Sequence, residues 1–270
     1  MAKDSAIAWT NNTYNPWIGC TKVSPACDNC YAESYSQQKR WVSAWGKDTP
    51  RYIPKTTRAQ VQAWQRRLAK TGGRKYVFCA SLADIFEAHP TAEAERPGLW
   101  DLIRTTPNLD WLLLTKRPQG YRTMLPPDVL VLPNVWPGTT VETADYLWRL
   151  DHLVGLGDVA GHCWVLYEPA LGPVDFTPWL PAVSWVIVGG ESTQPRGTRP
   201  LVPFRLEWAR DVIAQCRATG AAPFVKQLGS AHGPKHKDPS AWPEDLRVRE
   251  YPRSVVACPV GSEVRVGEHA

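Results

Sequence analysis

The sequence contains no long apolar run. Asn11, Asn12, Asn15 and Pro16 interrupt the first hydrophobic stretch, and no later stretch approaches the roughly 20 apolar residues that a membrane-spanning helix needs. An export signal would also show as an uninterrupted apolar segment near the start of the chain. We therefore expect no membrane contact and a cytoplasmic location.

A disulfide framework is also missing. Seven cysteines are an odd number, and Cys79, Cys163, Cys216 and Cys258 stand alone in the chain. The other three cysteines lie close together, within residues 20–30. This distribution is typical of a metal site in a reducing compartment and not of a disulfide scaffold.

Basic residues are in small excess over acidic ones. The chain has 31 basic against 26 acidic residues, a formal net charge of +5, which permits a polyanionic partner without indicating one. With 43% hydrophobic residues, its 270 residues suffice for one large core. We expect one barrel-sized domain over residues 1–230. A basic tail over residues 231–270 would pack on it or cover its mouth as a lid.

Short β-rich runs alternate with helical stretches along most of the chain. The predicted strands are Lys75–Ala80, Trp111–Thr115, Val135–Thr139, Cys163–Tyr167, Trp185–Val188 and Pro223–Lys226, with one more just before Cys20. The predicted helices are Ala92–Thr105, Ala144–Val154 and Pro203–Ala218, and two further pieces lie within Glu33–Leu68. The strands are continuous apolar runs, as expected when both faces are covered. The pattern predicts an α/β fold with a parallel sheet, a partial or full (β/α) barrel.

Polar residues follow the predicted strands where barrel enzymes carry their chemistry, on the loops that leave the carboxyl ends of the strands. The candidates at these positions are Ser81, Asp84, Lys116, Thr139, Thr140, Glu142, Glu168, Glu191, Lys226 and Gln227. Any single one could be a helix cap or a solvated loop residue. Six such positions in succession favour a shared site.

Cys20, Cys27 and Cys30 have the spacing C-x6-C-x2-C, and no fourth cysteine or histidine is near them. Structural zinc prefers four protein ligands. A thioredoxin-like reading of the Cys27–Cys30 pair leaves Cys20 unexplained. Three thiolates can instead hold a [4Fe–4S] cluster with one iron open, so we predict an iron–sulfur site on these three residues.

Several strings in the chain resemble known families. Cys27-Asp28-Asn29-Cys30-Tyr31-Ala32 resembles the C-x-x-C-Y-A ending of many radical S-adenosylmethionine (SAM) motifs, although its first cysteine gap is wider than usual. The whole chain resembles a three-cysteine-motif family found in phages and prophages. The strings that carry this resemblance are Trp17–Cys20, Leu114–Pro118, Val188–Ser192, Phe224–Gln227 and Trp242–Leu246. More distantly, the series of strand-end residues is similar to that of spore photoproduct lyase, a radical SAM enzyme that acts on DNA thymine.

The resemblance implies a radical SAM enzyme, in which a reduced cluster cleaves SAM and the 5′-deoxyadenosyl radical abstracts hydrogen from a substrate. It implies that Tyr31 lies near the SAM adenine, that Ser81 contacts SAM and that Lys116 pairs with the SAM carboxylate. Thr139 or Thr140 would reach the carboxylate or the ribose. A flavodoxin- or ferredoxin-type protein would supply the electron.

The remaining strand-end residues are candidates for substrate contact or catalysis: Asp84, Glu142, Glu168, Glu191, Lys226 and Gln227. Glu191 follows two glycines, which would give a ligand room for close approach. The alternative for Glu168, Glu191 and Gln227 is a buried ion-pair network with Arg196, Arg199 or Lys226 that merely closes the barrel.

The phage resemblance, the aromatic residues and the basic residues favour a nucleic-acid base or nucleotide as substrate. Phage DNA thymine is the best guess. Bases would stack on tryptophans such as Trp17, Trp136 and Trp242. The tail would hold phosphates through the basic residues Lys235, His236, Lys237, Arg247 and Arg249. Two alternatives stay open: a radical SAM enzyme for a small metabolite or a peptide, and a non-enzymatic metal-bearing module that binds nucleic acid.

Overall fold

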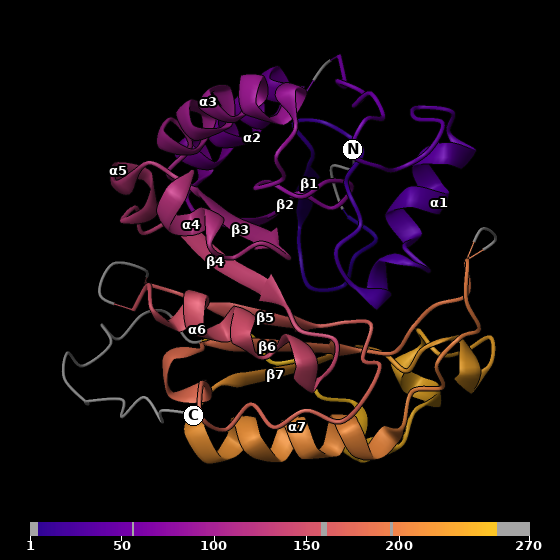
Figure 1. The fold of residues 1–270 in the computed structure, drawn as a ribbon. Coiled ribbons are helices and arrows are strands. Elements are labelled where there is room, and N and C mark those ends of the chain that lie inside the picture. Colours follow the sequence, from indigo (N-terminus) through magenta and orange to yellow (C-terminus); the bar gives the residue numbers. More distant parts are fainter. Residues whose placement is uncertain (1–4, 56, 158–160, 195–196, 253–270) are drawn as a thin grey trace, which may run out of the picture.

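The computed structural model describes residues 5–252, apart from residues 56, 158–160 and 195–196. Its centre is one seven-stranded sheet in which neighbours in the chain are neighbours in the sheet and every pair is parallel. The strands are β1 (Asn12–Tyr14), β2 (Lys75–Cys79), β3 (Leu109–Thr115), β4 (Val135–Thr140), β5 (Trp164–Tyr167), β6 (Trp185–Gly189) and β7 (Ala222–Gln227). The sheet curls into a half-barrel, which confirms the predicted partial (β/α) barrel (Figure 1).

The α-helices are α1 (Tyr31–Gln38), α2 (Thr57–Thr71), α3 (Pro90–Arg104), α4 (Gly120–Thr123), α5 (Pro127–Leu130), α6 (Trp148–Val154) and α7 (Leu206–Thr219). Helices α2 to α7 cover the outer side of the curled sheet, and α1 lies apart from them (Figure 1). Short 3₁₀ helices are η1 (Pro25–Cys27), η2 (Ala144–Tyr146), η3 (Leu180–Ala182), η4 (Ser230–His232), η5 (Pro239–Ala241) and η6 (Glu244–Leu246). Of these elements, α1 lies toward the carboxyl ends of the strands, beside the loop that follows β6 (Figure 1).

The predicted elements match the observed ones closely, but α4 and α5 were not predicted, and two of the predicted elements differ. The first strand ends at Tyr14 and not just before Cys20, so residues 15–19 form a separate connection into the cysteine segment. The predicted helix Ala144–Val154 is divided into η2 and α6. The six later strands were each predicted to within two residues at either end.

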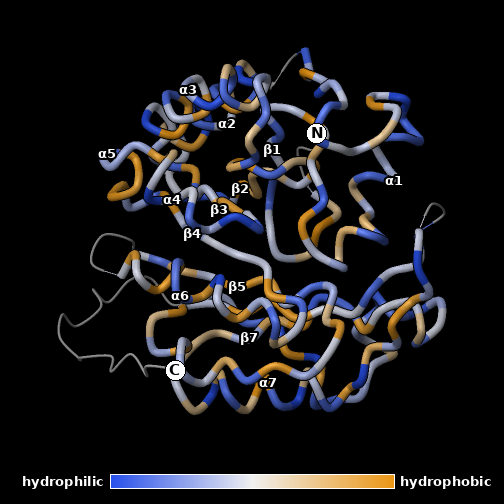
Figure 2. Tube along the Cα trace, in the orientation of Figure 1, coloured by the Kyte–Doolittle hydropathy of each residue, from blue (hydrophilic) through white to orange (hydrophobic). Residues whose placement is uncertain are grey.

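The two faces of the sheet bury different side chains because side chains alternate along a strand. Val77, Leu113 and Val165 belong to the outer core between the sheet and the helices. The inner face carries a second cluster, which we call the tryptophan plug, made of Trp9, Phe78, Leu112, Trp136, Trp164, Leu166, Trp185, Ile187, Ala222 and Phe224. In Figure 2, hydrophobic and hydrophilic residues alternate along α7, as expected for a helix with one face against the sheet.

The tryptophan plug fills the amino-terminal end of the half-barrel. Trp136, Trp164 and Trp185 occupy the first or second position of β4, β5 and β6. Gly138 makes room for the plug, because a Cβ atom there would lie 2.3 Å from the Trp164 indole. The open space of the half-barrel is therefore at its other end, where the strands finish.

The segment after β7 folds back along the edge of the sheet. Val225 on β7 donates its N–H to the carbonyl of Val248 (2.8 Å), and Trp242 and Leu246 are buried in the outer core. Tyr251 stacks on Tyr76 with ring centroids 5.8 Å apart. Residues 253–270, which include the rest of the predicted tail and Cys258, lie outside the described residues.

Two of the basic residues expected to bind phosphate serve this segment's own fold. Arg247 donates to the carbonyl of Trp242 (2.8 and 3.0 Å). Arg249 lies over the rings of Phe224 (5.5 Å) and Trp242 (5.4 Å). Both guanidinium groups therefore already have partners within the protein.

Candidate functional site

The three clustered cysteines lie on the loop that follows β1, at the carboxyl-terminal end of the half-barrel. Gly19 leads into this loop with a positive φ of +116°, and a Cβ atom there would lie 2.7 Å from Cδ of Arg51. Only glycine combines this backbone conformation with that close approach. Cys27 ends η1, and Cys30 is the residue that caps the start of α1. Local structure thus fixes the path of the chain between the first and the third thiol.

The thiols of this loop are shielded from water, and Cys27 is near enough to Cys20 and Cys30 to raise the pKa of both. Cys20 and Cys27 are buried, and Cys30 is half-buried. Burial, together with the charge of Cys27, raises the pKa of the Cys30 thiol to about 11. Burial, Asp84 and Glu87 raise the pKa of Cys20 well above its ordinary value. Thiolates at these positions therefore require nearby positive charge.

All described cysteines are free thiols: Cys20, Cys27, Cys30, Cys79, Cys163 and Cys216. Across the described part of the chain, no three or more His, Cys, Asp or Glu side chains are arranged as they would be around a metal ion. In the described ranges, the side chains around the loop therefore do not form a coordination shell.

Asp84 holds a guanidinium group beside the first cysteine. Its Oδ2 accepts hydrogen bonds from Arg117 Nη1 (2.8 Å) and from the N–H of Lys116 (3.0 Å). Its Oδ1 accepts from Thr115 Oγ1 (2.7 Å). Arg117 Nη1 in turn lies 3.9 Å from Sγ of Cys20. Oδ2 of Asp84 thus positions Arg117, a residue that the sequence analysis did not place at the cysteines, while Oδ1 ties Asp84 to the end of β3.

Glu142 links three residues to the second and third cysteines. Lys116 Nζ and Ser24 Oγ (2.9 Å) both contact its Oε1, and Arg149 Nη1 donates to its Oε2 (2.8 Å). Ser24 Oγ is also 3.8 Å from Sγ of Cys27. Burial opposes ionisation of Glu142, but Lys116 and Arg149 outweigh it and hold the pKa below its usual range. The ammonium of Lys116 is close enough to Cys30 to lower the pKa of that thiol.

A fully buried ion pair lies under the cysteine loop. Arg51 donates to both oxygens of Glu87 (2.9 and 2.8 Å) and to Thr21 Oγ1 (3.2 Å). Trp17 Nε1 donates to Oε1 of the same glutamate (3.0 Å). This pair joins the segment before α2 to the cysteine loop. No sequence pattern indicated it, because its two members are 36 residues apart.

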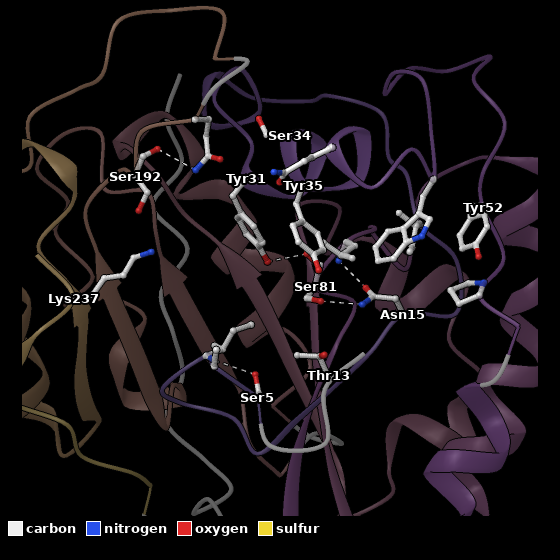
Figure 3. A pocket seen from close by; sticks show the side chains of 18 of the residues that line it. Ser5, Thr13, Asn15, Tyr31, Ser34, Tyr35, Tyr52, Ser81, Ser192 and Lys237 are labelled. Atoms are coloured by element: carbon white, nitrogen blue, oxygen red, sulfur yellow. Dashed lines mark hydrogen bonds between the residues drawn. The ribbon is translucent and has the colours of Figure 1, made fainter. Parts of the chain in front are cut away.

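The hydroxyl groups of Thr139 and Ser81 already have protein partners. Thr139 Oγ1 donates to the carbonyl of Thr115 (2.9 Å) and is buried. Ser81 Oγ accepts from Asn15 Nδ2 (2.9 Å), and its carbonyl accepts from the Tyr31 hydroxyl (2.8 Å) (Figure 3). Thr140 alternates with Thr139 along β4 and shares the inner face of the sheet with Trp136. Thr140 is therefore better placed than Thr139 for a ligand at the mouth.

The strand ends on the far side of the mouth are joined by ion pairs. Lys226 Nζ lies 2.7 Å from both oxygens of Glu168, and Gln227 Nε2 donates to Oε1 (2.5 Å). Glu191 is buried and accepts from Arg199 Nη2 (2.6 Å) and Nη1 (3.0 Å). These contacts agree with the alternative in which Glu168, Glu191 and Gln227 belong to an ion-pair network that closes the barrel. Arg196, which that alternative also named, lies outside the described residues.

The glycine pair before Glu191 serves internal packing. A Cβ atom on Gly190 would lie 2.6 Å from the carbonyl of Leu228 and 2.7 Å from Cβ of Phe204. A Cβ atom on Gly189 would lie 3.0 Å from the Glu168 carboxylate. The expectation that these glycines give a ligand room is therefore wrong for the folded chain, because the protein's own atoms occupy that space.

The three tryptophans expected to stack on bases are all buried. Trp17 donates to Glu87, Trp136 stacks on His162 at 3.9 Å, and Trp242 packs in the outer core. Their relative exposures are 0%, 5% and 3%. None of the three offers a face to a base, so this expectation is also wrong.

A pocket of about 1090 Å³ opens beside the cysteine loop. One face of α1, the end of β1, the loop after β6 and the segment after β7 contribute to its lining (Figure 3). Two of the predicted site residues, Tyr31 and Ser81, line it. The mouth of the half-barrel therefore combines a thiol loop, a set of paired charges and a large pocket.

The fold and the site together define the class of protein: a parallel β/α half-barrel with a three-cysteine loop at the carboxyl ends of its strands. A family model described as "Protein of unknown function (DUF5131)" matches residues 4–253, and the chain belongs to this family. No curated protein and no solved structure matches the chain. Among the helices in the described ranges, none has the length and apolar character needed to cross a bilayer.

Proposed function

We propose that this protein is a radical SAM-type enzyme that holds a [4Fe–4S] cluster through Cys20, Cys27 and Cys30. The observation that carries the proposal is the position of three thiols on one loop at the mouth of a parallel half-barrel, with two cations beside them. In such barrels the chemistry belongs at the carboxyl ends of the strands. When bound, the cluster and SAM supply one-electron chemistry that generates a hydrogen-abstracting radical.

Three cysteines on one loop are the donors that a cluster with one open iron would need. Ionising three neighbouring thiols in a shielded loop concentrates negative charge, which burial makes unfavourable. Arg117 at Cys20 and Lys116 near Cys30 offset that charge. Asp84 keeps Arg117 in place, and its role in the proposal is to position that guanidinium group and not to meet substrate.

The proposal assigns the SAM carboxylate to Lys116. Its ammonium is paired with Glu142, and Glu142 has a second cation in Arg149, so the glutamate keeps a partner if Lys116 turns to a ligand. Tyr31 and Ser81 would line the nucleoside part of the site, and Thr140 would take the role that Thr139 cannot. A flavodoxin- or ferredoxin-type donor would supply the electron.

The roles proposed for the far strand ends are more limited. Glu168, Lys226 and Gln227 form one hydrogen-bonded group that would border the substrate, whereas the Glu191–Arg199 pair would hold the loop after β6. A carboxylate that already has two donors can keep an adjacent loop in a fixed position without taking part in chemistry.

The test is the metal content of anaerobically purified protein. Wild type should contain iron and show the broad visible absorption of thiolate-to-iron charge transfer, and Cys27→Ala should lose both, because a cluster with two thiolate ligands is labile. Cys216→Ala is the matched control: it removes a buried thiol on α7, away from the loop, and should keep the iron. Full iron content in Cys27→Ala, or zinc in place of iron in wild type, would contradict the proposal.

A further inference from the structure

The pocket beside the cysteine loop is large for a single small molecule. Its volume of about 1090 Å³ exceeds the range of roughly 300–1,000 Å³ that such sites occupy. Tyr31 and Ser81 form only one edge of it, and residues from α1 to the segment after β7 line the remainder. The pocket therefore has space for a second molecule next to one bound at the Tyr31–Ser81 edge.

Aromatic residues form one wall of this pocket. Tyr31, Ser34, Tyr35 and Gln38 all line it, and their spacing puts them on one face of α1. Tyr31 and Tyr35 are 45% and 43% exposed, which is high for tyrosines in a pocket wall. Figure 3 shows both side chains projecting from α1 toward the other walls.

The aromatic wall continues beyond α1. Tyr35 meets Trp41 edge to face with ring centroids 5.7 Å apart, and Trp41 stacks on Tyr52 at 5.9 Å with nearly parallel planes. We call Tyr35, Trp41 and Tyr52 the aromatic row. An exposed ring backed by further rings is a platform on which a planar heterocycle can stack.

The charged side chains among the described residues that line the pocket are all basic. Among the described residues that line it, none is Asp or Glu, and Lys55, His236 and Lys237 contribute basic groups. This differs from the cysteine side of the mouth, where Lys116 and Arg117 have carboxylate partners. In the described ranges, no carboxylate lies within 4.0 Å of the ammonium of Lys55 or Lys237. Figure 3 shows Lys237 on a separate wall and directed toward Tyr31.

We propose that this pocket binds a nucleotide, with its base against the aromatic row and its phosphate at Lys237 and Lys55. A planar base and a phosphate anion are the two groups that a stacking platform and unpaired ammonium groups complement. Gln60 also lines the pocket and can donate to the base or the sugar, and Ser192 Oγ, which donates to Gln227, can accept a hydrogen bond from either. This assignment rests on the proposed function in one respect only: it names the substrate class of that enzyme.

The experiment is isothermal titration calorimetry on the iron-loaded protein with SAM present. The titrants are the four deoxynucleoside 5′-monophosphates and the corresponding deoxynucleosides. At least one monophosphate should bind, with affinity that falls as salt rises, and its deoxynucleoside should bind more weakly with little salt dependence. Lys237→Gln should weaken monophosphate binding about ten-fold and leave the deoxynucleoside unchanged. Tyr35→Leu should weaken both about five-fold or more, because stacking contributes about 1–3 kcal/mol per base.

Matched controls are available on the surface. Lys70 is an exposed lysine in the last turn of α2, and Trp148 is an exposed aromatic residue at the start of α6; neither lines the pocket. Lys70→Gln and Trp148→Leu should leave nucleotide binding unchanged. Equal weakening by a control and by its pocket counterpart would overturn the assignment.

Further measurements distinguish a free nucleotide from a nucleotide within a strand. They also distinguish failure of this inference from failure of the proposed enzyme function. An eight-residue single-stranded oligonucleotide that binds far more tightly than the monophosphates, and still depends on Tyr35, supports a nucleotide presented within a strand; similar affinities support a free nucleotide. N-acetyltyrosine binding as tightly as a nucleotide would overturn the assignment. No nucleotide binding at low salt, in protein that holds iron and SAM, overturns this inference alone. Nucleotide binding by protein that takes up no iron overturns the proposed function alone.

Discussion

The two ends of the half-barrel are built from the same strands and differ in what fills them. At the amino-terminal end, the inner face carries aromatic side chains in direct contact, such as Trp9 with Phe78 at 4.6 Å and with Trp164 at 5.3 Å. At the carboxyl-terminal end, Glu142 and Glu168 are each held by a lysine from another strand end. One end is stabilised by burial of apolar surface, and the other carries the groups able to do chemistry.

The difference follows from the free-energy cost of burying a charged group. An aromatic ring gains from removal of water and carries at most one N–H or O–H group to satisfy, whereas a buried carboxylate is a full charge and is stable only with partners. Each of the two glutamates therefore has at least two donors. Substitutions at the two ends should consequently differ in size and in their dependence on pH.

The largest effect should come from Trp164→Ala in the tryptophan plug. Removing this indole opens a cavity between Trp9, Trp185 and Gly138, and it breaks the hydrogen bond from Trp164 Nε1 to the carbonyl of Trp136 (3.0 Å). We expect the free energy of unfolding, measured by urea denaturation, to fall by about 3–5 kcal/mol. Trp148→Ala is the control, because Trp148 is exposed on the outer surface. Similar losses for the two variants would mean that the plug does not stabilise the fold.

A smaller, pH-dependent effect should come from Glu142→Gln at the mouth. The charged acceptor of Lys116, Arg149 and Ser24 is lost, so we expect a decrease of about 1.5–3 kcal/mol in the free energy of unfolding at pH 7. The folded-state pKa of Glu142 is lower than its value of 4.5 in an unfolded chain. Its contribution is therefore present above pH 4.5 and is lost as the pH falls through the folded-state pKa.

The measurement is urea denaturation of both proteins between pH 7 and pH 3. The difference in free energy of unfolding between wild type and Glu142→Gln should be constant down to about pH 5 and should decrease below pH 4.5. Glu207→Gln is a control on the surface of α7, where the partner Arg210 is also exposed, and little change is expected. A difference that stays constant down to pH 3 would show that ionisation of Glu142 is not what stabilises this side of the mouth.

The sheet was predictable because buried parallel strands leave a strong pattern in the sequence. Each is a short apolar run flanked by turn residues, as in Trp111-Leu112-Leu113-Leu114. The grouping of the cysteines on one loop followed from their spacing alone. The carboxyl-terminal position of the other candidates followed from the order of strands and loops.

The partners at the mouth were not predictable in the same way. The pairs Arg51–Glu87 and Asp84–Arg117 join residues 36 and 33 positions apart, and nothing local selects one arginine over another. The tryptophans were misjudged for a related reason. A tryptophan that fills a barrel and one that offers a face to a base look alike in sequence, since both stand among apolar residues or beside turns. The curvature of the sheet encloses Trp136, whereas packing of distant segments encloses Trp17 and Trp242.

The smallest effect should come from Tyr251, which closes the open side of the tryptophan plug. Its ring stacks on Tyr76 at 5.8 Å and lies 5.2 Å from Trp185, and its hydroxyl donates to the carbonyl of Ala8 (3.1 Å). Since Tyr251 is half-exposed, Tyr251→Ala should lower the free energy of unfolding by only about 1 kcal/mol. Tyr251→Phe keeps the ring and should lose no more than half of that. Iron content should not change in either variant, because Tyr251 belongs to the plug and not to the mouth. If instead Tyr251→Ala lost iron while its stability stayed near wild type, the two ends of the half-barrel would be coupled, and the division between a stabilising end and a chemical end would fail.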